Sequence, residues 1–76
     1  MKVVVSHDMD GHFHVFKIEN RKEIFEFIKN DLEDGDAWAN SDYSDDFSYI
    51  KLSYEEWIDF INDFVSRGSL EIIDFA

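Results

Sequence analysis

The chain has 76 residues, enough for one domain and too few for two, so residues 1–76 are expected to form a single domain. It contains no cysteine, which excludes disulfides and thiolate metal sites, and 17% of its residues are aromatic, unlike a disordered acidic tail. Its 18 acidic residues oppose seven Lys and Arg, giving a formal net charge of −11. Such a field repels nucleic acid and anionic lipid and attracts basic proteins.

The beginning of the sequence predicts a β-hairpin. Residues 2–7 are rich in β-branched side chains, and Asp10-Gly11 is a strong turn signal before a second strand at residues 12–18. Apolar side chains in this second strand occupy both odd and even positions. Because alternate residues of a strand point to opposite faces, we expect both faces of the sheet to be partly covered.

A helix is predicted next, from Arg21 to Glu33. Asn20 is a suitable N-cap, Glu23 completes a pattern like a capping box, and Gly35 is a plausible stop. The apolar stripe that defines this helix consists of Ile24, Phe25, Ile28 and Leu32.

Residues 34–46 have no apolar period and are rich in Asp, Ser, Asn and Gly, which predicts a loop. The loop is long for a domain of this size, and long loops are often functional. A third strand is predicted at residues 47–52.

The last part of the sequence predicts a second helix and a final strand. Ser53 and Glu56 form a capping box, and Arg67 with Gly68 marks the end of the helix. A strand follows at residues 70–75. The apolar stripe of the helix is Tyr54, Trp57, Ile58, Ile61, Phe64 and Val65.

The predicted fold class is therefore α+β, with a small, mainly antiparallel sheet, two helices on one face of it, and the order β-β-α-β-α-β. The core is expected to combine residues of both helices and the strands. Its expected members are Ile24, Ile28, Trp57, Ile61 and Phe64 against Val3, Val5, Ile50 and Ile72.

The hairpin holds every histidine of the chain and two carboxylates, between His7 and His14. The string from Ser6 to Gly11 resembles the first motif of DHH phosphoesterases, which implies a metal-dependent reaction. One spacer residue between His7 and Asp8 is missing, however, and the later motifs and the length of that family are absent. We therefore interpret the segment as a polar turn and predict no metal site.

Arrangements typical of catalysis are not found in the sequence. There is no cysteine nucleophile, no serine in a G-x-S-x-G elbow, and no glycine-rich phosphate loop. We predict a protein that is not an enzyme and needs no cofactor. A Ca²⁺ site in the Asp-rich loop is an alternative, although the spacing of an EF-hand is missing.

Carboxylates gather between residues 30 and 50, where no Lys or Arg occurs. Two further rows are expected on the helices: Glu19, Glu23, Glu26 and Glu33 on the first, and Glu56, Asp59 and Asp63 on the second. Phe27, Phe60, Trp38 and Tyr43 are expected to be exposed aromatics within this acidic surface. The candidate partner-binding residues are Asp31, Glu33, Asp34, Asp36, Trp38, Asp42, Tyr43, Asp45 and Asp46.

In size, acidity and lack of catalytic motifs, the chain resembles small phage-encoded inhibitors of host defence of the anti-CRISPR and DNA-mimic type. The resemblance is one of composition and implies a basic, nucleic-acid-binding protein as the partner. It gives no residue a role, and the oligomeric state stays open. The alternatives are a small bacterial adaptor whose acidity serves solubility, and a divalent-metal-binding protein. No apolar run suits a signal peptide or a membrane span, so we expect the cytoplasm, that of the host if the protein is phage-encoded.

Overall fold

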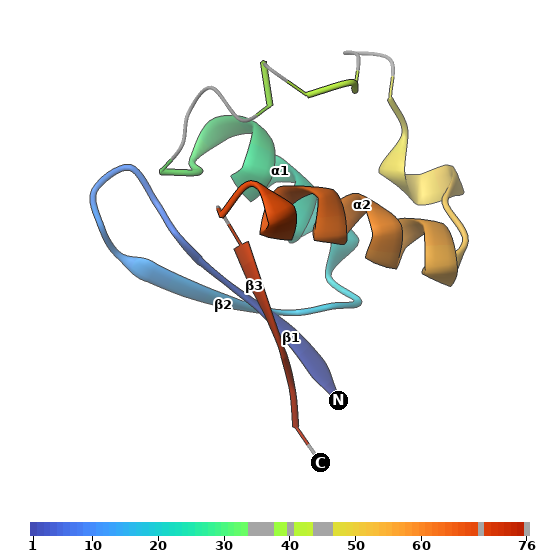
Figure 1. Ribbon diagram of the computed structural model, residues 1–76, viewed down its shortest axis with the longest axis horizontal. Coiled ribbons are helices and arrows are strands. Elements are labelled where there is room, and N and C mark those ends of the chain that lie inside the picture. Colours follow the sequence, from blue (N-terminus) through green and yellow to red (C-terminus); the bar gives the residue numbers. More distant parts are fainter. Residues whose placement is uncertain (34–37, 40, 44–46, 69, 76) are drawn as a thin grey trace.

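The computed structural model describes residues 1–33, 38–39, 41–43, 47–68 and 70–75. A hairpin is followed by a helix, a short 3-10 helix, a second helix and a final strand (Figure 1). The elements are β1 (Lys2–His7), β2 (Phe13–Lys17), α1 (Arg21–Asn30), η1 (Tyr49–Lys51), α2 (Tyr54–Ser66) and β3 (Leu70–Asp74).

The strands form one antiparallel sheet in the order β2-β1-β3. The first strand is central because the hairpin places β2 on one side of it and the C-terminal strand pairs with the other. In this register Val4 lies between Phe16 and Ile72, and Ser6 lies between His14 and Leu70. Both helices lie on the same side of the sheet (Figure 1), so the predicted α+β class is confirmed.

The core forms between the helices and the sheet face that carries Val4. Trp57, Ile61 and Phe64 of α2 are completely buried, and Ile24 and Ile28 of α1 nearly so. The indole Nε1 of Trp57 donates a hydrogen bond of 2.7 Å to the carbonyl oxygen of Ile18. This bond gives the largest core side chain a partner for its polar atom.

Several core predictions need correction. Ile50 is 73% exposed, and Val5 is half-buried, because Val4 and not Val5 faces the helices. Phe27 and Phe60, which the sequence placed among the exposed aromatics, are buried at 5% and 2% exposure. They extend the apolar stripes of the helices toward the edges of the core.

The predicted third strand, residues 47–52, is instead the 3-10 helix η1, with extended residues on either side of it. Two backbone carbonyl oxygens of this segment accept hydrogen bonds from a side chain, where a strand would accept them from a neighbouring strand. The guanidinium of Arg21 donates to the carbonyl oxygens of Tyr49 at 3.3 Å and Leu52 at 2.7 Å. The ring of Tyr49 lies 4.6 Å from that of Phe25, which holds the segment over the helices.

The first helix is shorter than predicted, because α1 ends at Asn30 and not at Glu33. Beyond it, Leu32 forms an isolated bridge with Asp8, and the backbone N–H of Glu33 donates to the carbonyl oxygen of His7. The side chain of the N-cap Asn20 makes no capping bond, so the expected capping box of α1 is absent. Pairing with the hairpin therefore ends the helix before Gly35, which lies outside the described residues.

The capping box of α2 is confirmed. The hydroxyl of Ser53 accepts the N–H of Glu56, and the Glu56 carboxylate accepts the N–H of Ser53. At the other end, Gly68 follows the C-cap Arg67 with a φ of 79°, a conformation that glycine adopts without strain.

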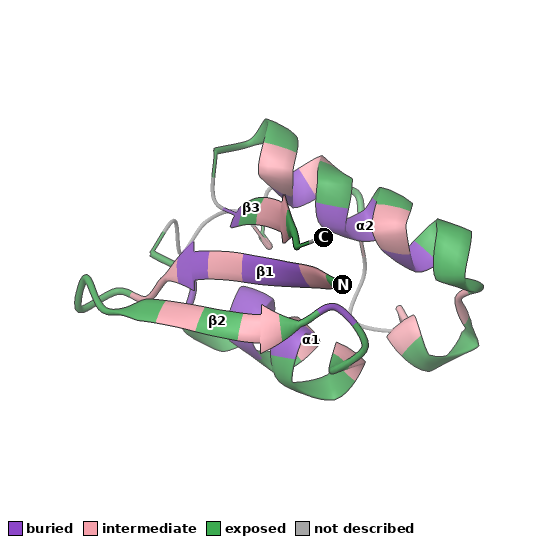
Figure 2. Cartoon of the chain, turned by 90° about the horizontal axis from the view of Figure 1, so that it is seen from below, coloured by how far each residue is buried: buried purple, intermediate pink, exposed green. Residues whose placement is uncertain are grey.

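The second face of the sheet has no helix over it in the part of the chain that the structure describes (Figure 2). Phe13 and Val15 on this face are 70% and 64% exposed. On the central strand of the same face, however, Val3 is 6% exposed and Val5 is half-buried, so this face is partly covered as expected, although by no described helix. No described helix is both long and apolar enough to cross a membrane.

We predict that Ile61→Ala lowers the free energy of unfolding by about 2–5 kcal/mol, because it leaves a cavity in the centre of the core. The matched control is Ile50→Ala, the same change at an exposed site, which should cost no more than about 0.5 kcal/mol. Urea denaturation of both variants measures the difference. Equal costs would contradict the burial described here.

Candidate functional site

The tip of the hairpin is organised by one carboxylate, that of Asp8. Its Oδ1 accepts the backbone N–H groups of Asp10 and His12, each at 2.9 Å. Its Oδ2 lies 2.8 Å from Nε2 of His14 and 3.5 Å from Nδ1 of His12. Gly11 adopts a φ of 82° and donates its N–H to the carbonyl oxygen of Asp8. Asp8 therefore fixes the turn and orients two of the three histidines.

These contacts lower the pKa of Asp8 from 3.8 to about 2. The hydrogen bond from His14 is the largest cause, followed by that from the backbone of His12. Each contact stabilises the ionised carboxylate. The negative charge of Asp8 is thus part of what holds the hairpin together.

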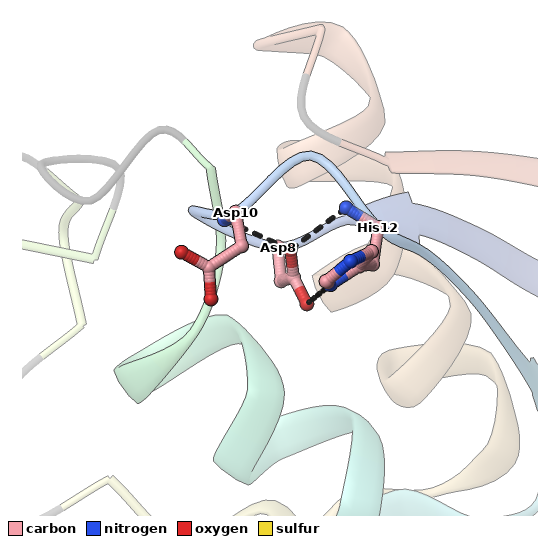
Figure 3. A group of neighbouring side chains, drawn as sticks. All are labelled: Asp8, Asp10 and His12. Carbon is pink, nitrogen blue, oxygen red and sulfur yellow. Dashed lines mark hydrogen bonds and ion pairs between the residues drawn. The ribbon is translucent and has the colours of Figure 1, made fainter.

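The same residues meet the geometric condition for a small metal site. One ligand atom each from Asp8, Asp10 and His12 lies within 4.8 Å of the others, and Figure 3 shows Asp8 between the other two side chains. Both oxygens of Asp8, however, are already engaged by backbone and ring nitrogens. A metal ion would have to displace the histidine contacts that position this carboxylate.

We therefore keep the prediction that the hairpin is a turn and not a tight metal site. Calorimetric titration with Zn²⁺, Mn²⁺ and Mg²⁺ should show no affinity in the micromolar range or better. The prediction is wrong if such an affinity is measured and is lost in the double variant His12→Ala, His14→Ala.

A second prediction concerns the stability of the protein at acid pH. Because the pKa of Asp8 is lower in the folded protein, its charge adds stability above about pH 4, and this contribution is lost as the pH falls toward 2. The difference in unfolding free energy between wild type and Asp8→Asn should therefore shrink as the pH falls below about 4. Urea titrations at a series of pH values measure it.

His14→Phe is the companion variant, because it keeps a ring against Phe27, whose centroid lies 4.9 Å away, and removes the nitrogen that binds Asp8. It should remove part of the same acid dependence. A difference between wild type and Asp8→Asn that stays constant down to pH 2 would contradict the role assigned to Asp8.

The candidate partner-binding residues are only partly placed by the structure. Asp31, Glu33 and Asp42 are exposed, and the Glu33 carboxylate lies 3.6 Å from Nδ1 of His7. Trp38 and Tyr43 are half-buried. The other members of the set, Asp34, Asp36, Asp45 and Asp46, lie outside the described residues.

Trp38 and Tyr43 pack against the core. The Trp38 ring meets that of Phe25 edge-on at 5.2 Å, and the Tyr43 ring meets that of Phe60 at 4.8 Å. The hydroxyl of Ser41 donates to the carbonyl oxygen of Trp38 at 2.6 Å, which closes the turn between the two aromatics. Burial raises the pKa of Tyr43, and the Asp63 carboxylate adds to this shift. Both aromatics thus cover the helices while keeping part of their surface in solvent.

The two expected rows of carboxylates differ in how many of their members already bind other groups of the protein. On α2, Glu56 is bound in the capping box and Asp63 lies 3.5 Å from Arg67. On the side of α1, Glu33 falls beyond the end of the helix and Glu19 precedes its N-cap Asn20, so the helix itself carries only Glu23 and Glu26 of the expected row, both exposed.

Glu23 and Glu26 border a shallow hollow of about 280 Å³ between α1 and β2, here named the acidic hollow. Phe16 and Phe27 supply its apolar part, and no Lys or Arg is among the residues that line it. Sequence reasoning missed this site because it combines a strand and a helix through a contact that no local pattern reveals. The lining residues are His14, Phe16, Glu23, Glu26, Phe27 and Asp31.

Comparisons with family models, with curated proteins and with solved structures found no match to this chain.

Proposed function

We propose that this is a non-enzymatic binding protein that blocks or modulates a basic, nucleic-acid-binding protein surface through clustered carboxylates. The observation that carries the proposal is the acidic hollow. Glu23, Glu26 and Asp31 line it together with the half-buried Phe16 and the edge of the buried Phe27. An arginine side chain suits such a site, because its guanidinium binds carboxylates in a planar fork and also stacks on aromatic rings.

The net charge of −11 supports the same partner class at longer range. A strongly acidic protein attracts basic surfaces and accelerates the encounter with them. Neighbouring carboxylates three or four residues apart on a helix lie roughly 5–6 Å apart at Cβ. Duplex DNA carries one charge per roughly 1.7 Å of axis, divided between two strands, so the exposed pair Glu23 and Glu26 on α1, with Glu19 just before the helix, offers a much sparser track of the same sign.

The acidic loop is a second contact region in this proposal. Asp31 borders the acidic hollow, and Asp42 lies beside Tyr43 in the segment that covers the helices.

We predict that Glu23→Gln with Glu26→Gln weakens binding of an arginine-rich peptide by about tenfold, or about 1.4 kcal/mol. The matched control is Glu55→Gln with Asp59→Asn, which removes the same charge from exposed sites on α2. Calorimetry at two salt concentrations measures both. Binding should weaken with salt and should be tighter for the arginine peptide than for a lysine peptide of equal length.

Equal losses in the two double variants would mean that only net charge matters, and the hollow would then have no role. The triple variant Asp34→Lys, Asp36→Lys, Asp45→Lys tests the loop: its affinity should fall in the same titration, and stopped-flow mixing should show that mainly association is slowed. Trp38→Ala should mainly raise the dissociation rate, read beside a thermal melt because Trp38 also packs on Phe25. If acidity served solubility alone, the loop reversals would leave affinity and salt dependence unchanged.

A further inference from the structure

The uncovered face of the sheet is apolar over most of its area. Strand alternation places Val3, Val5, Phe13, Val15 and Ile73 on it, opposite the face that carries Val4. Val3 is already buried at 6% exposure, and Val5 and Ile73 are half-buried. Phe13 and Val15 are 70% and 64% exposed. The same alternation carries the face on to the ends of the chain, where Met1 is 65% and Phe75 53% exposed.

Among the described side chains of this face, the ionisable ones are Lys17, Glu71 and His7, and the N-terminal ammonium of Met1 lies 3.6 Å from the Asp74 carboxylate at its edge. Lys17 lies at the end of the edge strand β2, in the row of Val3 and Ile73. Glu71 lies on the other edge strand, β3, in the neighbouring row of Val5 and Val15. The two charges are thus of opposite sign and sit on opposite edges, one row apart.

We infer that this face binds a second copy of the same chain. The arrangement is two sheets packed face to face about a twofold axis parallel to β1. That rotation places β2 of one copy over β3 of the other. Each row of residues paired across the three strands keeps its position along the strand direction. Lys17 of one copy then lies over Ile73 of the other, one row from Glu71.

Rows on one face of a strand are separated by about 6.7 Å, and packed sheets lie about 10 Å apart, so a lysine side chain can span this offset. Symmetry makes the Lys17–Glu71 pair twice. A twofold axis perpendicular to the strands would instead place β2 over β2 and bring like charges onto the same edge. The charges therefore select the orientation, while the apolar side chains supply the affinity.

The size of the face suits a weak dimer. An aromatic side chain buries about 150–250 Å² when it is fully covered, so the exposed parts of this face amount to about 400–500 Å² per copy. Two copies would bury about 800–1,000 Å² in total, at or below the roughly 1,000 Å² that a specific interface needs, which is why the dimer is expected to be weak. Affinity in the micromolar range is expected.

The proposed dimer does not rest on the proposed function. The salt dependence of binding distinguishes the two. Each copy carries a net charge of −11, so two copies repel each other, and screening this repulsion should strengthen the dimer. Binding to a basic partner should weaken with salt for the opposite reason. The two surfaces should therefore respond in opposite directions.

Sedimentation velocity from about 5 μM to about 500 μM, which spans the affinities usual for small interfaces, tests the inference. Wild type should pass from monomer to dimer across this range. Val15→Thr, which keeps a β-branched side chain at an exposed position, should raise the dissociation constant about tenfold, and its thermal melt should match that of wild type.

The Lys17–Glu71 pair is tested by exchanging the two charges. Lys17→Glu and Glu71→Lys should each weaken the dimer about threefold or more, and the double exchange should restore it to within about twofold of wild type. Lys51→Glu is the matched control for Lys17→Glu, because it makes the same charge change at an exposed residue outside this face. A protein that stays monomeric throughout the range, or a dimer that neither Val15→Thr nor the exchange alters, overturns the inference.

Discussion

Trp57 is the residue on which the described parts of the fold converge. Its buried indole donates to the carbonyl oxygen of Ile18, at the junction between the hairpin and α1. The guanidinium of Arg21 lies over its ring at 5.5 Å and also binds the backbone of η1. One side chain of α2 thereby fixes the end of β2, the start of α1 and the segment between the helices. The chain has seven Lys and Arg, and one of them is committed to this structural contact, which leaves fewer cations to offset the acidic surface.

The second constraint is the small size of the chain. Two helices of 10 and 13 residues cover one face of the three-stranded sheet, and in the described part no element covers the other. The molecule therefore separates its surface chemistry. Carboxylates such as Glu23 and Glu26 lie on the helix side, and Phe13 and Val15 lie on the open side. A protein with both properties can bind by charge on one face and by apolar contact on the other.

The sequence predicted those parts of the fold that depend on local signals. The Asp10-Gly11 turn and the Ser53 capping box act within a few residues, so their patterns were sufficient. The early end of α1 and the exchange of a strand for η1 could not be predicted in this way. Both arise from contacts between distant segments: Leu32 pairs with Asp8, and Arg21 binds the carbonyl oxygen of Leu52.

For the candidate sites, the sequence indicated that the surface is acidic but not where the carboxylates lie relative to the other side chains. The acidic hollow brings Phe16 of β2 beside Glu23 of α1, a juxtaposition set by tertiary packing. The sequence did indicate that the open sheet face carries apolar side chains. Phe13 and Phe16 occupy an odd and an even position of one strand, so they point to opposite faces of the sheet. What the sequence could not show was which of the two faces the helices would cover.

The topology of the sheet also has a consequence for how the chain folds. The central strand pairs with β3 through partners as far apart in sequence as Lys2 and Asp74. The hairpin can form early because its contacts are local, but one edge of β1 stays unpaired until the last strand arrives. Closing so long a loop is slow compared with forming a hairpin or a helix. Until β3 pairs, this edge of β1 offers unpaired backbone groups to strand addition from another chain, and the strong negative charge of every copy opposes such encounters.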